Sequence, residues 1–354
     1  MYREAITDDY DRRAYEQILR TMQKAPSRAS QFGSRVGERI RPVGERFTKR
    51  IPAVVSDGFE SVFIAALSGL RSITIDPALR SVVSSRVVNA YAKDDPGIRG
   101  LVEISNLPLE TIDRVTPGLH WRYAIVAAVE GAATGAVITG AELVAVGGTV
   151  ASAGVAAVPG AGTVIGAMAL DTALVLAASA RVVAHIGAYH GYDTRLKQEE
   201  LFALSVINWS TSISATAKSE AFRQLSQLTQ QLARGATWIK LNEHAFVRAT
   251  TKVFEQLGFK LTKEKLGQAI PVIGMALGAG LNAQMVRSVA IDASLAYRMR
   301  HLMEKYNLSP EAAVGNNRQA DEVDSIDITG IIEEAIEESN SLGADEHRPP
   351  EVSA

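Results

Sequence analysis

The sequence contains no cysteine among its 354 residues. This absence excludes disulfide bonds, thiolate metal sites and cysteine nucleophiles, and it is compatible with a reducing cytosol. Aromatic residues make up only 6% of the chain, whereas 28 residues are glycine. Few aromatic side chains together with many small residues favour close packing of helices over a β-sandwich.

Three further features are absent or weak in this chain. No segment alternates polar and apolar residues with a period of two, so we expect no β-sheet and predict an all-α fold. The first twenty residues have no apolar core of signal-peptide length, so we expect no secretion signal. The net charge is −2, which provides no strong overall field, and we expect no nucleic-acid partner.

The charges that are present are distributed unevenly. Residues 20–50 carry nine Lys/Arg and two Glu, and such a basic stretch with a thin apolar stripe can either lie on an anionic bilayer or form a solvated linker. Residues 311–354 carry twelve Asp/Glu and two Arg, so we predict a mostly disordered acidic tail from residue 309. The isoleucines between 326 and 336 could instead form one short helix.

Two segments lack charge altogether. Residues 143–170 are 28 residues without a formal charge, and residues 269–286 form a shorter relative. Glycines and Pro159 interrupt the first segment, which argues against an ordinary transmembrane helix. We therefore predict a compact helical bundle with two glycine-rich apolar helical hairpins, the first turning near residues 159–162. These hairpins either enter a bilayer or form a soluble core.

The expected helices follow from apolar periodicity and from breaks at Pro and Gly. Asp76 and Pro77 read as an N-cap followed by a first helical residue, and Gly191 and Gly258 read as helix ends. We expect helices at residues 7–24, 52–72 and 77–92, from Asp171 to Gly191, at 201–213, and as two helices within 218–257.

These patterns divide the chain into four parts. Residues 1–50 are a basic, partly disordered extension, and residues 51–116 form an N-terminal helical region. Residues 117–308 form the central helical domain, and residues 309–354 form the acidic tail.

Short motifs in the central domain resemble those of a known family. The motifs are Glu130-Gly131, Gly135, Asp171, Gly191-Tyr192-Asp193, Glu199-Glu200, residues 270–274, Gly278 and Asn282-Ala283. Their order and spacing resemble the EcsC family of bacterial proteins over roughly residues 120–305. The family takes its name from a gene beside an ABC transporter operon, so the resemblance implies a membrane-proximal role and no enzymatic activity to carry over.

Four polar residues are candidates for a site. Glu130 and Asp171 stand at the edges of the uncharged region, where a charge is costly unless it is paired. His190 and Asp193 lie near the next helix end. One reading is a polar site for an ion, a lipid head group or a small substrate. The other is structural: the acids are neutralised within the bundle by Arg181 or Arg287, or they cap helix starts.

Pairs of glycines four residues apart allow helix backbones to approach closely. The sequence 278–283 also matches the letters of a dinucleotide fingerprint, but no strand precedes it, so we expect no cofactor. His185 and His190 are five residues apart, off the spacing of helical metal pairs, so we expect no metal ion. The packing glycines are Gly131 with Gly135, Gly162 with Gly166, and Gly274 with Gly278.

Three functional hypotheses follow. The first is a non-enzymatic helical protein in the cytoplasm, peripheral to or partly inserted in the cytoplasmic membrane, with a lipid surface and an envelope or transporter protein as partners. The second is a soluble helical protein that binds a hydrophobic or lipid ligand. The third, ranked lowest, is a hydrolase that uses Asp171, Asp193 and His190.

Overall fold

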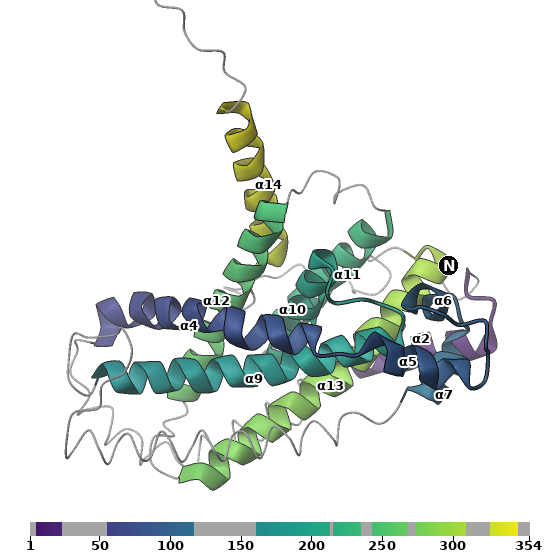
Figure 1. The fold of residues 1–354 in the computed structure, drawn as a ribbon, viewed down its shortest axis with the longest axis horizontal. Coiled ribbons are helices and arrows are strands. Elements are labelled where there is room, and N and C mark those ends of the chain that lie inside the picture. Colours follow the sequence, from purple (N-terminus) through teal and green to yellow (C-terminus); the bar gives the residue numbers. More distant parts are fainter. Residues whose placement is uncertain are drawn as a thin grey trace, which may run out of the picture.

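The computed structural model describes residues 5–22, 55–116, 161–212, 215–234, 243–267, 274–308 and 326–345. Every regular element in these ranges is a helix, so the predicted all-α fold is confirmed. The helices pack into one compact bundle (Figure 1). They are α2 (Asp9–Met22), α4 (Val55–Arg80), α5 (Ser84–Ala92), α6 (Leu101–Ser105), α7 (Leu109–Val115), α9 (Ala161–Tyr189), α10 (Lys197–Thr211), α11 (Ala215–Arg234), α12 (Glu243–Gly267), α13 (Gly274–Tyr306) and α14 (Ile328–Asp345).

The helix α9 is the centre of the bundle. It runs beside α4 along much of its length, and α13, α10 and α12 also pack against it (Figure 1). Ala173, Leu176, Ala180 and Val183 follow one another at helical spacing and are fully buried. Because α9 is apolar on nearly every side, it is stable only where other helices surround it.

Two stretches of the described chain are long and apolar enough to cross a membrane, judged by length and composition alone. They are Ser61–Ala92, which comprises most of α4 and all of α5, and Ala169–Tyr189 in α9. They differ in burial, because 67% of the apolar window in α9 is buried within the protein but only 28% of the window in Ser61–Ala92. α9 is therefore a core helix, whereas α4 leaves much apolar surface uncovered.

The helix α4 continues past its predicted end. The predicted helix start at Pro77 is wrong, because Pro77 lies inside α4. Proline removes the donor that would bond the carbonyl of Ile73, but Ile73 is 67% exposed, so water can replace that donor. Ile75 and Leu79, on either side of the proline, are buried in the core and hold this part of the chain helical.

The helix α12 also passes through a predicted end. Gly258 was expected to close it, but the helix runs on to Gly267. A Cβ atom at Gly258 would overlap the side chain of Leu67 on α4, which is itself fully buried. Glycine inside a helix costs about 1 kcal/mol relative to alanine. Here its missing side chain is what allows α4 and α12 to touch.

Replacing Gly258 with alanine should therefore lower the free energy of unfolding by about 1–3 kcal/mol, because the added methyl group overpacks the contact with Leu67. Gly69 on α4 is the matched control, since no described atom lies within 4 Å of its Cβ position. There, alanine should raise the free energy of unfolding by about 0.5–1 kcal/mol. Urea unfolding measures both, and stabilisation by both substitutions would contradict the contact.

The helices α9 and α13 end in the same way. Gly191 follows α9 with a φ of 89°, and the amide of Tyr192 donates to the carbonyl of Gly187 at 2.9 Å. Asn307 follows α13 with a φ of 48°, and the amide of Leu308 bonds back to α13 at 3.0 Å. This left-handed turn closes a helix and favours glycine or asparagine. The predicted helix end at Gly191 is confirmed.

The acidic C-terminal segment contains a docked helix. α14 packs on α12 and α11, and it buries Ile328, Ile331, Ile332 and Ala335. The predicted disordered tail is therefore wrong for residues 326–345, where the alternative of a short helix is confirmed. The other tail residues lie outside the described ranges. Acidic composition did not prevent folding here, because the isoleucines find an apolar partner face on another helix.

Three helices begin at one end of the molecule. In Figure 1 the N-terminal ends of α4, α9 and α13 lie at the left and lower left, together with the C-terminal end of α12. These ends adjoin residues 23–54, 117–160 and 268–273, which lie outside the described ranges. The first residues of α9 and α13 belong to the two uncharged segments.

The two predicted hairpins remain predictions. Glu130, Gly131 and Gly135 lie outside the described residues. Gly162, Gly274 and Gly278 lie within α9 and α13, but their surroundings are not described. At Gly166 no described atom lies within 4 Å of the Cβ position, so the described residues provide no close helix contact there.

Candidate functional site

Two neighbouring acids in the first turn of α10 are buried in the core. Glu199 and Glu200 are 6% and 4% exposed. Successive residues of a helix point about 100° apart, so the two carboxylates meet different arginines. Arg300 of α13 donates two hydrogen bonds to Glu199, Nη1 to Oε2 at 2.6 Å and Nη2 to Oε1 at 2.8 Å. Arg71 of α4 binds Glu200.

Aromatic rings and carboxylates surround the guanidinium of Arg300. Its Cζ lies 3.8 Å from the ring centre of Tyr192 and 4.6 Å from that of Phe202. Its Nε donates to Glu304 at 2.8 Å, and the Tyr192 hydroxyl donates to the same carboxylate at 2.8 Å. Burial by itself lowers the pKa of Arg300. The neighbouring carboxylates, Glu199 first among them, together raise the pKa by more than burial lowers it, so the pKa lies above its ordinary value. The arginine is therefore a fixed, permanent charge.

The second arginine joins three helices. Besides Glu200 of α10, Arg71 contacts Thr250 of α12 at 3.2 Å and Asp76 of its own helix at 3.4 Å. Lys197 also donates to Glu200 at 3.1 Å. A buried carboxylate without a partner is very costly, so these pairs fix how α4, α10, α12 and α13 are arranged.

A half-open cleft of about 610 Å³ lies beside the Glu199 carboxylate. Its walls come from the starts of α5, α6 and α10 and from the turn after α9. Within it, Arg195 Nε donates to Asp193 Oδ1 at 2.8 Å, and this bond is the main reason that the pKa of Asp193 is lowered. The polar groups that line the cleft belong to Ser84, Ser85, Asn89, Arg99, Asp193, Arg195 and Glu199.

The cleft has the size of a small-molecule site. Its lining, as described, contains no histidine or cysteine. Its one deeply buried acid, Glu199, is held by two nitrogens of Arg300, so this pairing occupies both carboxylate oxygens. The arrangement can hold a small polar molecule by hydrogen bonds.

His190 is fully buried immediately below this turn. Its Nδ1 lies 2.9 Å from the Ile186 carbonyl, and its ring stacks on Tyr297 of α13 with centres 5.8 Å apart. Burial lowers the pKa of His190 from 6.5 to about 4. The imidazole is therefore neutral at physiological pH and packed as a core residue.

The structure does not bring the predicted site residues together. Asp171 lies in the middle of α9, so its predicted role as a helix cap is wrong. It accepts a hydrogen bond from Asn282 Nδ2 of α13 at 3.2 Å. His190 lies 19 residues further along, which corresponds to roughly 28 Å of helix. A hydrolase that uses Asp171, Asp193 and His190 in one centre is therefore excluded by this separation. Glu130 lies outside the described residues.

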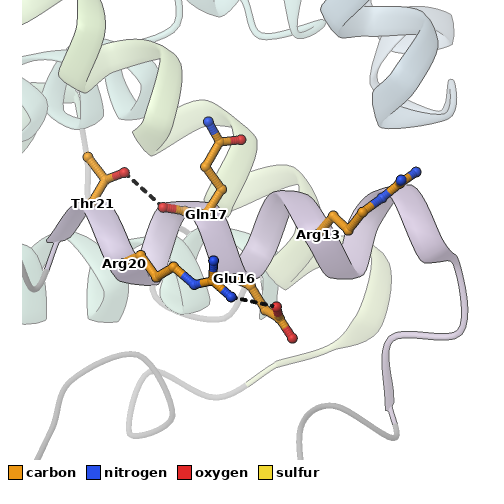
Figure 2. A pocket seen from close by; sticks show the side chains of 5 residues that line it. All are labelled: Arg13, Glu16, Gln17, Arg20 and Thr21. Carbon is orange, nitrogen blue, oxygen red and sulfur yellow. Dashed lines mark hydrogen bonds and ion pairs between the residues drawn. The ribbon is translucent and has the colours of Figure 1, made fainter.

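A second depression lies on α2. It is lined by five residues of that single helix, and Figure 2 shows their side chains along it. Arg20 Nη2 lies 3.4 Å from Glu16 Oε2, and Thr21 donates to the Gln17 carbonyl at 2.8 Å. Since no second described element converges on these groups, the depression is a polar helix surface and not a site.

Comparison with known proteins bears directly on this core. The model described as "EcsC protein family" matches residues 145–302. The resemblance of the sequence motifs to this family is thus supported over residues 145–302. The chain is also 24% identical over 224 residues to "Uncharacterized protein YdbA" of Bacillus subtilis (strain 168), which covers 62% of this chain and 70% of that protein. No solved structure is significantly similar to the chain.

The EcsC motifs have structural roles in this protein. Gly191 forms the turn after α9, and a Cβ there would lie 2.5 Å from the backbone nitrogen of Ser105. Tyr192 covers Arg300, and Glu199 and Glu200 each hold an arginine. Two motif residues that are distant in the sequence also meet, because Asn282 of α13 donates a hydrogen bond to Asp171 of α9.

Sequence reasoning missed both arginines. Arg71 lies outside the EcsC region, and Arg300 stands near the end of that region, in a helix that also buries Asp292. The available signal was the pair of adjacent acids at Glu199 and Glu200, which directly precedes the mostly apolar run from Leu201 to Ile207. Two carboxylates there require two buried cations.

Proposed function

We propose that this protein is a non-enzymatic, membrane-associated helical protein of the EcsC type. It attaches to the cytoplasmic face of the cytoplasmic membrane and serves there as an accessory to an envelope or transporter complex. The observation that supports attachment most directly is the common location of three helix starts. The basic stretch precedes α4 in the sequence, and the two uncharged segments include the first turns of α9 and α13. The N-terminal ends of these three helices lie at the left and lower left of the bundle (Figure 1).

The charge of the chain also supports attachment to an anionic membrane. Residues 20–50 carry nine basic residues against two acidic ones and lead directly into α4. Each basic residue near an anionic bilayer contributes about 1 kcal/mol to binding. The acidic helix α14 packs on α12 and α11.

The core supports a role in binding rather than in catalysis. The buried acids are held by arginines, and His190 is packed against Tyr297. Among the described residues no group of three or more His, Asp or Glu side chains is placed to hold a metal ion. The cleft beside Glu199 offers hydrogen-bonding groups but no activated nucleophile.

Binding of the full-length protein to vesicles tests this proposal. We expect the protein to sediment with vesicles of phosphatidylglycerol and phosphatidylcholine at low salt, and to do so less at high salt because salt screens the basic stretch. Replacing Arg35, Arg39 and Arg46 together with glutamine should weaken binding by about 1 kcal/mol for each residue.

The matched control neutralises three cations elsewhere on the surface. Arg86, Lys93 and Arg99 are exposed in the described structure and far along the chain from the basic stretch. Their replacement with glutamine should leave vesicle binding nearly unchanged. A wild-type protein that stays soluble and monodisperse with these vesicles at low salt would contradict membrane association.

A further inference from the structure

We infer that the exposed face of α4 is the surface by which the folded bundle rests on an anionic lipid bilayer. This inference rests on the proposed membrane association and names the surface responsible. We define the α4 outer face as Val62, Ala65, Gly69 and Ile73. These residues follow one another by three or four positions and so form one stripe.

The α4 outer face is apolar and uncovered. Val62 is 38% exposed and Ile73 is 67% exposed, and Ala65 and Gly69 between them are also exposed. No described atom lies within 4 Å of the Cβ position of Gly69. No charged side chain belongs to this stripe over three helical turns. A soluble surface helix normally places its charges on this side.

The opposite face of α4 accounts fully for its role in the fold. Phe63, Leu67 and Ile75 are each 0% exposed and pack in the core. Arg71 on this inner face is held by Glu200 and Thr250. The folding of the bundle therefore does not require Val62 and Ile73 to be apolar. A contact with a partner outside the chain explains why they are apolar.

A lipid surface is the occupant that the charges favour. The nine basic residues of 20–50 directly precede α4, and anionic head groups attract such a segment. Exposed Arg80 closes the other end of α4. An apolar stripe flanked by cations is the pattern of a helix that lies in the plane of the membrane interface.

Two other arrangements are disfavoured by the contacts of α4. Crossing the bilayer would carry Arg71 and its carboxylate partners into hydrocarbon while α4 remains packed on α9. A second copy of the chain would need about 800 Å² of buried surface on each partner, and a single stripe that includes Ala65 and Gly69 offers too little. An in-plane helix satisfies both constraints.

The absence of cysteine allows a direct test by labelling. Single cysteines at Val62, Ile73 and Val102 would each carry an environment-sensitive fluorophore. Val102 of α6 is the matched control, since it is 72% exposed and lies on a different element. With vesicles of phosphatidylglycerol and phosphatidylcholine, probes at 62 and 73 should shift to shorter wavelength and be quenched by lipid-borne quenchers. The probe at 102 should not change.

Charge substitutions provide the second measurement. Val62→Asp with Ile73→Asp should lower the vesicle partition coefficient at least about tenfold, because two apolar side chains leave the interface. Val102→Asp should leave it within about twofold. Circular dichroism confirms that each variant is folded.

The outcomes separate the two proposals. Failure of the wild type to bind vesicles overturns the proposed function, and this inference falls with it. If the wild type binds but the probes at 62 and 73 stay in water, the inference alone is overturned. Burial of those probes without vesicles as the protein concentration rises would identify a second copy as the occupant and would also overturn it.

Discussion

Replacing Arg300 with methionine should lower the free energy of unfolding by about 3–5 kcal/mol. Arg300 neutralises Glu199, whose side chain is only 8% exposed, and also contacts Glu304. Without the guanidinium, Glu199 would remain as a buried charge with no cation at its oxygens. Equilibrium unfolding in urea at neutral pH measures the loss.

A surface pair provides the control for this result. Lys252 binds Glu334 of α14, and the two side chains are 43% and 53% exposed. Because exposed pairs contribute little, Lys252→Met should cost less than about 1 kcal/mol. Equal losses for Arg300→Met and Lys252→Met would show that burial of the Glu199 pair does not matter.

The double variant Glu199→Leu with Arg300→Met separates the pair from its parts. In the double variant no buried carboxylate remains without a cation. It should therefore be more stable than Arg300→Met alone. Glu304 remains, but its side chain is 30% exposed and water can solvate it. A loss equal to the sum of the single losses would contradict coupling between the two residues.

Acidification should destabilise the protein through His190. Burial lowers its pKa in the folded state to about 4, against 6.5 in the unfolded chain. Between these values the unfolded chain binds more protons, so the free energy of unfolding falls as the pH drops from 6.5 to 4 and does not change on this account above 6.5. About 2.5 pH units at 1.36 kcal/mol each give a total of about 3 kcal/mol.

Groups on α13 add to the effect. After burial, the Ile186 carbonyl raises the pKa of His190 somewhat, whereas His301 and Arg298 lower it because they disfavour a further positive charge. Burial also lowers the pKa of His301, so part of the acid sensitivity belongs to that residue. A variant at His190 isolates its share.

The variant His190→Phe keeps a buried ring beside Tyr297 and removes the titrating group. Its free energy of unfolding, measured from about pH 7.5 to about pH 4.5, should depend less on pH than that of the wild type. His185→Phe is the control, because it removes a half-exposed histidine from the same helix. Parallel pH curves for the wild type and His190→Phe would contradict the assignment.

Local sequence signals predicted part of this fold correctly. The lack of alternation predicted helices, and Gly191 marked the end of α9. The motif order also identified the EcsC region. Each of these signals depends on residues that are close together in the chain, where backbone conformation is limited by the residues themselves.

The same local signals failed where a distant contact determines the outcome. Pro77 and Gly258 read as breaks, but Ile75, Leu79 and the contact with Leu67 keep α4 and α12 continuous. The acidic tail read as disordered, but α14 finds apolar partners on α12 and α11. A helix propensity differs between residue types by about 1 kcal/mol, and the burial of several apolar side chains contributes more free energy than that.

The sequence by itself determined the helical class, most helix positions and the presence of polar residues that need partners. Only the tertiary structure decided which partners they have. Glu199 and Arg300 are 101 residues apart, and Arg71 and Glu200 are 129 apart. No local pattern specifies such pairs, because their energy comes from joint removal from water once α4, α10 and α13 have packed together.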